Sequence, residues 1–129
     1  MLADAPAFSG FAVPDIPAAR AFYGDVLGLN TEIVDETNGL MTLHLAGGRD
    51  TLVYVKPDHK AATYTILNFS VPDIDAAVDA LASRGVEFER YEGMPQDDKG
   101  ILRGRAAQRG PDVAWFTDPA GNILSVLQE

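Results

Sequence analysis

The chain has no cysteine among its 129 residues. This excludes disulfide bonds, thiolate metal sites and cysteine nucleophiles, and it agrees with a reducing cytoplasm. No window reaches the roughly 20 apolar residues that a membrane-spanning helix needs. The first residues, Met1–Pro6, lack the basic and apolar segments of a signal peptide. We therefore expect a cytoplasmic protein that makes no membrane contact.

Basic residues are also scarce. Ten Lys and Arg face nineteen Asp and Glu, so the formal net charge is −9 at pH 7. Such a surface repels phosphate backbones, and nucleic acid is not an expected partner. The charge serves either solubility or the attraction of a cationic ligand, and both interpretations stay open.

The chain carries an internal repeat. Residues 11–19 read FAVPDIPAA and residues 69–77 read FSVPDIDAA, with seven of nine positions identical. Two copies of this length indicate a duplicated half-domain rather than a solenoid. We expect one domain spanning 1–129, with one module over about 8–57, a linker over 57–62 and a second module over about 63–129.

Each copy predicts the same order of elements. Proline ends a strand in each copy, Asp15 and Asp73 are expected to cap the following helices, and Gly28 and Gly85 to close them. Alternation and turn residues such as Asn38-Gly39 predict the strands, which cover residues 8–13, 31–36, 40–46 and 51–56, then 64–71, 87–92, 113–117 and 123–127. The fold class is therefore α+β, with two βαβββ modules forming a curved mixed sheet whose concave face suits a ligand.

Two segments are similar to a known family. DIPAARAFYGDVLGL, residues 15–29, resembles the first-helix signature of the vicinal-oxygen-chelate superfamily, and AWFTDPAGNIL, residues 114–124, resembles its closing hairpin. This is the glyoxalase, bleomycin resistance protein and dioxygenase family. The resemblance spans residues 8–128 and implies the fold. It leaves the reaction open, because the family includes enzymes and drug-sequestering proteins.

The resemblance also implies where a metal ligand would stand. The family's enzymes place His or Glu on strands one, four, five and eight, and the matching positions here are Phe8, Tyr54 (or Val53), Ile66 and Ser125. None is a good ligand for a divalent ion, so we expect no metal and no cofactor. An all-carboxylate site stays open.

The two histidines do not indicate a metal site either. His44 lies in a predicted strand and His59 in the linker, and the fold gives no reason for them to converge. The ordinary pKa of His44 suits a general base. Nothing in the sequence places an orienting carboxylate or a nucleophile beside it.

Strand alternation predicts which side chains face the concave side. The candidate ligand-binding residues share that face and are Phe8, His44, Tyr54, Ile66, Asn68, Trp115 and Ser125. The alternative is that Trp115 and Tyr54 only fill the interior. The segment 93–111 holds Lys99, Arg103, Arg105 and Arg109. It is either a lid in which Arg103 binds an anionic ligand, or a loop whose cations pair with the acidic surface.

These observations favour a metal-independent small-molecule-binding protein of the drug-sequestering resistance type. Because such relatives bind cationic drugs between two subunits, the resemblance also implies a homodimer. The alternative is a glyoxalase-like metal-dependent lyase or isomerase, or a dioxygenase, that recruits an ion through carboxylates such as Glu32 or Glu36. A third interpretation is a regulatory module that needs a protein partner.

Overall fold

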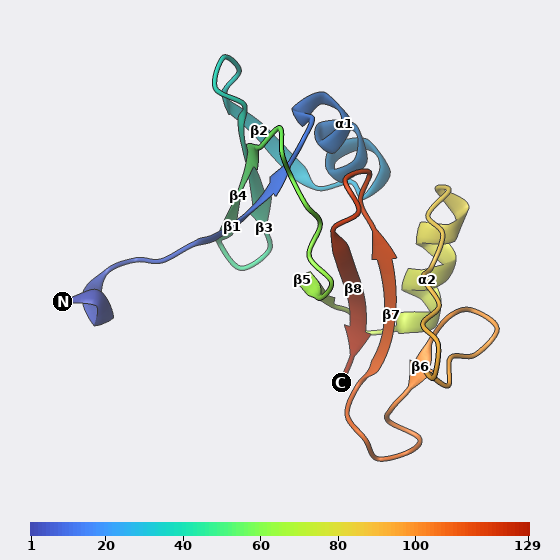
Figure 1. Cartoon of the computed structure of the whole chain (residues 1–129). Coiled ribbons are helices and arrows are strands. Elements are labelled where there is room, and N and C mark those ends of the chain that lie inside the picture. The colour runs from blue at the N-terminus through green and yellow to red at the C-terminus, as the bar shows by residue number, and fades with distance from the viewer. The chain divides into compact units, whose positions relative to one another are not determined.

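The computed structural model describes all residues from Met1 to Glu129. The chain divides into two compact units, Met1–Lys60 and Ala61–Glu129, and the division falls inside the expected linker. Each unit has one four-stranded mixed sheet and one main helical segment (Figure 1). The predicted α+β class and the duplicated βαβββ order are therefore confirmed. No helix is both long and apolar enough to cross a membrane.

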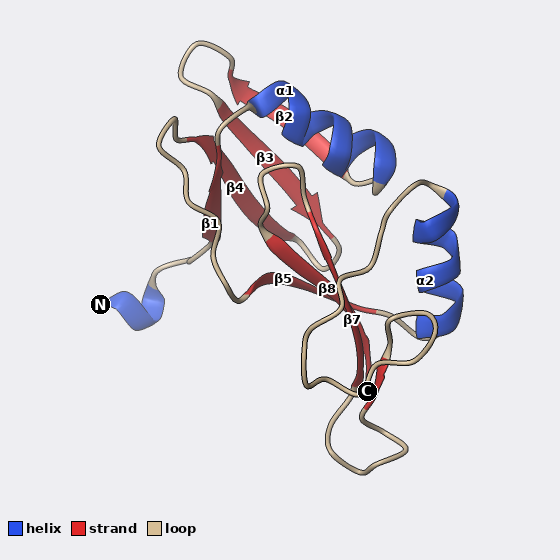
Figure 2. Cartoon of the chain, turned by 45° about the vertical axis from the view of Figure 1, so that its right-hand side comes forward, coloured by secondary structure: helices blue, strands red, loops and turns tan.

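The first unit begins with a short 3₁₀ turn and continues as the first βαβββ module. Its sheet has the order β1-β4-β3-β2, with β1 parallel to β4 and the other pairs antiparallel. The helical segment lies along one face of this sheet (Figure 2). The elements are η1 (Leu2–Asp4), β1 (Ser9–Val13), α1 (Ile16–Arg20), η2 (Ala21–Val26), β2 (Asn30–Asp35), β3 (Leu40–Leu45) and β4 (Arg49–Val55).

The second unit repeats this topology. Its sheet has the order β5-β8-β7-β6, with β5 parallel to β8. The helix lies along the face formed by β7 and β8 (Figure 1). The elements are β5 (Thr65–Ser70), α2 (Ile74–Ser83), β6 (Leu102–Arg103), β7 (Asp112–Thr117) and β8 (Ile123–Gln128).

Alternate residues of each strand pack against the helix. In the first unit Met41, Leu43 and Val53 are fully buried, as the period of two for side chains in a strand requires. In the second unit Phe116 and Leu124 are likewise fully buried. The opposite face of each sheet, which no helix of its own unit covers, is called the helix-free face below.

The two helices begin differently. Asp73 caps α2 as predicted, since its Oδ1 accepts from the amide of Ala76 at 3.1 Å. The same prediction for Asp15 is wrong, because its side chain makes no capping hydrogen bond. Pro17, the second residue of α1, has no N–H, so only the amide of Ala18, the counterpart of Ala76, is open to a capping side chain there.

The first helix continues past Arg20 as a π-helix over η2. The amide of Leu27 donates to the carbonyl of Phe22 at 2.9 Å, five residues back. Gly28 then ends the segment with φ of +73°, as Gly85 ends α2 with φ of +89°. The predicted left-handed closures are both present.

The predicted strand at 87–92 is wrong. Phe88 forms one isolated bridge to Phe116, and the strand that pairs with β7 beyond it is the two-residue β6. Gln96 explains the difference, because its side chain takes the backbone groups that a ladder would use. Its Nε2 donates to the carbonyl of Glu89 at 2.9 Å, and its Oε1 accepts from the amide of Tyr91 at 2.8 Å.

Candidate functional site

The helix-free face of the first sheet carries three of the predicted site residues, but spreads them out. Phe8 immediately precedes β1 and is 71% exposed, and extending the β1–β4 register by one residue places it opposite Asp50. Tyr54, 38% exposed, lies opposite Ala12. That is four residues further along the strand, or about 13 Å. Phe8 and Tyr54 therefore belong to different ends of this face.

The third residue, His44, is held between two carboxylates. Its Nδ1 lies 2.9 Å from Oδ1 of Asp50, and its Nε2 lies 3.1 Å from Oε1 of Glu32. The expectation that no carboxylate orients His44 is therefore wrong. The register of β2, β3 and β4 creates the cluster, because it sets Asp50 directly opposite His44. Sequence spacing alone could not reveal this pairing.

This cluster favours a charged imidazole. The hydrogen bond to Asp50, and then that to Glu32, raises the pKa of His44 above its usual 6.5. An imidazolium with both N–H groups bonded has no free lone pair, so in its charged form His44 cannot act as a general base. The two carboxylates also bond opposite ring nitrogens. No group of three His, Asp or Glu side chains is arranged to hold a metal ion.

The helix-free face of the second sheet brings three predicted residues into contact across three strands. Asn68, Ser125 and Trp115 lie side by side in the β5–β8–β7 register. Ser125 is fully buried and its hydroxyl donates to Oδ1 of Asn68 at 2.6 Å. The β5–β8 pairing shifts register at Ile66. The residue before it, Thr65, accepts a hydrogen bond from Nε1 of Trp115 at 3.2 Å through its hydroxyl.

Tyr91 joins this face and was missed by the sequence argument. Its ring meets Trp115 edge to face, with centroids 5.6 Å apart. Its hydroxyl is buried without a hydrogen-bond partner, and burial raises its pKa. Tyr91 was missed because a regular strand was predicted over residues 87–92. Such a strand gives no reason to place Tyr91 against Trp115. A buried hydroxyl without a partner marks a place where a ligand atom or water can bond.

Arg103 lies apart from both groups. Its guanidinium donates two bonds to Asp75 on α2, at 2.9 and 2.8 Å, and one to Asp97 at 2.9 Å. Lys99 pairs with Asp79 at 3.0 Å. Segment 93–111 is thus tied to α2 by its own cations. A role for Arg103 in ligand binding stays a prediction, and it would require these carboxylates to be displaced.

This tie predicts an acid-sensitive contribution to stability. The bonds from Arg103 lower the pKa of Asp75 from 3.8 to about 2, so the stabilisation is complete above pH 4 and disappears as pH falls toward 2. We expect Asp75→Asn to lower Tm at pH 7 and the gap to wild type to close near pH 2. Asp79→Asn, which loses only an exposed Lys99 pair, is the control. A gap that stays constant with pH would contradict this assignment.

The family follows from comparison with known proteins. Residues 7–126 match the family model described as the Glyoxalase/Bleomycin resistance protein/Dioxygenase superfamily. The chain belongs to this superfamily. No curated protein matches the sequence.

Solved structures of the superfamily share the fold. A member from Sphaerobacter thermophilus DSM 20745 has a TM-score of 0.69 and 26% identity, covering 97% of this chain and 98% of its own. TnmS3, an antibiotic binding protein from Streptomyces sp. CB03234, has a TM-score of 0.66 and 21% identity, covering 97% of each chain. FosX, a fosfomycin resistance protein from Listeria monocytogenes, has a TM-score of 0.68 and 13% identity, covering 96% of this chain and 90% of its own.

The residues at the positions implied for the superfamily's metal do not fit a divalent ion. Phe8 and Ile66 have no donor atom, and Tyr54 offers a phenol. The hydroxyl of Ser125 is already bonded to Asn68. Hard and borderline cations prefer carboxylate oxygen or imidazole nitrogen. The donor set at these four positions is therefore unsuited to metal binding.

Proposed function

We propose that this superfamily member binds a small cationic aromatic molecule without a metal and sequesters it. The observation that carries the proposal is the set of side chains on the helix-free face of the second sheet. Trp115 and Tyr91 supply aromatic surface. Asn68 and Thr65 supply polar atoms beside it. A mostly apolar surface with a few placed polar groups is typical of small-molecule sites.

Charge supports a cationic ligand. The net charge of −9 attracts cations to the protein, and an indole face binds them through its quadrupole. The hydrogen bond to Thr65 holds the indole in one orientation, which lowers the entropy lost on binding.

Two of the similar structures are of proteins connected with antibiotics. One is an antibiotic binding protein and another a fosfomycin resistance protein. At 21% and 13% identity they establish the fold, and their activities serve here as a hypothesis. The proposal includes a homodimer, with the ligand bound between subunits. Light scattering of the complex is then expected to give twice the chain mass of 13.8 kDa.

Titration with a panel of cationic glycopeptide and aromatic antibiotics tests the proposal. Trp115 is the one tryptophan in the chain, so its fluorescence reports on the site directly. By calorimetry, Trp115→Ala is expected to weaken binding at least about tenfold, because a buried aromatic contact contributes roughly 1.4 kcal/mol or more. Met94→Ala, which removes an exposed apolar side chain in the loop, is the control. The proposal is wrong if no compound of the panel binds, or if Trp115→Ala binds as tightly as wild type.

A metal-dependent lyase, isomerase or dioxygenase is the second candidate. One observation favours it, namely that Glu32 turns to the helix-free face and meets His44 there. Elemental analysis of the purified protein separates the two candidates. Stoichiometric nickel, zinc, manganese or iron that is lost in Glu32→Gln would replace the first proposal with the second.

A further inference from the structure

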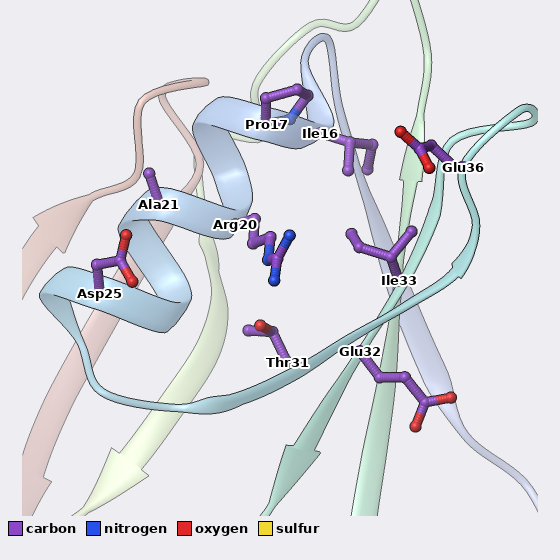
Figure 3. A pocket seen from close by; sticks show the side chains of 9 residues that line it. All are labelled: Ile16, Pro17, Arg20, Ala21, Asp25, Thr31, Glu32, Ile33 and Glu36. Atoms are coloured by element: carbon purple, nitrogen blue, oxygen red, sulfur yellow. The ribbon is translucent and has the colours of Figure 1, made fainter.

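A groove of about 970 Å³ lies in the first unit, between α1 with η2 and strand β2. It is on the helix side of the sheet, away from the helix-free face. Its size is within the range of small-molecule sites, roughly 300 to 1,000 Å³. The lining residues are Ile16, Pro17, Arg20, Ala21, Asp25, Thr31, Glu32, Ile33 and Glu36 (Figure 3).

The π-helix shapes this groove. In an α-helix, with about 3.6 residues per turn, a residue five positions on lies well off the face of the first. The wider π turn, with its i→i+5 bonds, returns it close to that face. This is why Arg20 and Asp25 line the same groove. Single π turns of this kind occur frequently at functional sites.

The charges of the groove follow a pattern. Figure 3 shows Arg20 in the middle, with Asp25 toward one end and Glu36 toward the other. The side chain of Glu32 points away, because its carboxylate is bonded to His44. The guanidinium of Arg20 has no ion-pair or hydrogen-bond partner in the protein. The unpaired guanidinium of Arg20 thus lies between the carboxylates of Asp25 and Glu36, and neither carboxylate bonds it.

The remaining lining is apolar. Ile16 and Pro17 from α1 and Ile33 from β2 form it, and all three lie around Arg20 in Figure 3. A ligand here meets carbon on both sides of the groove, a guanidinium in the middle and a carboxylate at either end.

These features exclude two simple ligand classes. A simple anion would be attracted by Arg20 and repelled by Asp25 and Glu36, whereas a simple cation would be repelled by Arg20. A zwitterion can pair with Arg20 and with one of the two carboxylates at once. We propose that the groove binds a free α-amino acid with an apolar side chain. Its carboxylate bonds Arg20, its ammonium group faces Glu36, and its side chain lies against Ile16 and Ile33.

This site is independent of the proposed function, since its lining belongs to the first unit, whereas Trp115 and Tyr91 belong to the second. Because Arg20, Asp25 and Glu36 are exposed, solvent weakens each charge pair. A dissociation constant in the millimolar range is expected.

L-Leucine is a suitable probe, followed by amide chemical shifts of the ¹⁵N-labelled full chain. The expected shifts concentrate on α1, η2 and β2. Leucinamide lacks the carboxylate and N-acetyl-leucine lacks the ammonium group, so both are expected to bind roughly tenfold more weakly. Arg20→Gln and Glu36→Gln are expected to weaken leucine binding to a similar extent. Arg49→Gln, an exposed arginine of the same unit outside the groove, is expected to bind as wild type does.

Each other result overturns the inference. Equal binding of leucine and N-acetyl-leucine would make this an anion site, and equal binding of leucinamide would make it a cation site. Absence of shifts at tens of millimolar leucine would mean that the groove binds no amino acid. Arg20→Lys, which keeps the charge and loses the fork, is expected to fall between wild type and Arg20→Gln. Failure here leaves antibiotic binding at Trp115 unaffected.

Discussion

Replacing Gly39 with alanine is expected to lower the free energy of unfolding by about 3 kcal/mol. Gly39 has φ of +68°, and a Cβ there would overlap Cγ1 of Val55 and lie 2.8 Å from its Cβ. The turn cannot move away easily, because the amide of Val55 donates to the carbonyl of Gly39 at 2.9 Å. The substitution therefore combines an unfavourable backbone conformation with steric overlap.

Gly48→Ala is the matched control. Gly48 has nearly the same φ, +70°, but a Cβ there would meet no atom within 4 Å. It is expected to cost about 1 kcal/mol, from the left-handed conformation alone. Urea denaturation at constant m-value measures both. Equal losses in the two variants would show that Val55 accommodates the extra methyl group and that only backbone conformation matters.

Removing the carboxylate of Asp118 is expected to have an effect of similar size in the second unit. Asp118 is 4% exposed, and its Oδ1 accepts from the amides of Ala120 and Asn122, both at 2.9 Å. Its Oδ2 accepts from Nδ2 of Asn122 at 3.0 Å. Asp118→Ala leaves these donors unpaired in a buried turn, which costs about 3 kcal/mol. The expected fall in Tm is roughly 10 °C.

Asp118→Asn distinguishes the bonds from the side-chain volume. Its one amide oxygen still accepts from the two backbone amides, while its amide nitrogen faces the nitrogen of Asn122. A loss about half that of alanine is expected. Thermal unfolding of the three proteins provides the comparison. If asparagine is as damaging as alanine, the bond to Asn122 is the important one. The turn joins β7 to β8, which carry Trp115 and Ser125, so ligand binding is expected to weaken in parallel.

The repeat also explains how the two units differ. At an offset of 58 residues, Pro17 in the first module corresponds to Asp75 in the second. Proline removes an amide from the start of α1, and Asp15 makes no cap there. Aspartate at the same place accepts the guanidinium fork of Arg103 and ties down the loop. This difference between the copies therefore accounts for the long-range contact that only the second unit makes.

The sequence by itself determined the fold of each unit, because the signals are local. The repeated Val-Pro-Asp segment placed the starts of both helices. It also predicted that Asn68, Trp115 and Ser125 share a face, since strand period and hairpin register follow from neighbouring residues.

The tertiary structure alone decided which polar groups meet. His44 bonds Glu32 twelve residues away, Arg103 bonds Asp75 across 28 residues, and Gln96 turns a predicted strand into a loop. Such contacts depend on strand register and on side-chain reach in three dimensions, which no periodicity encodes. The groove around Arg20 belongs to the same class, because a π turn that moves Asp25 to its face is a feature of packing rather than of pattern.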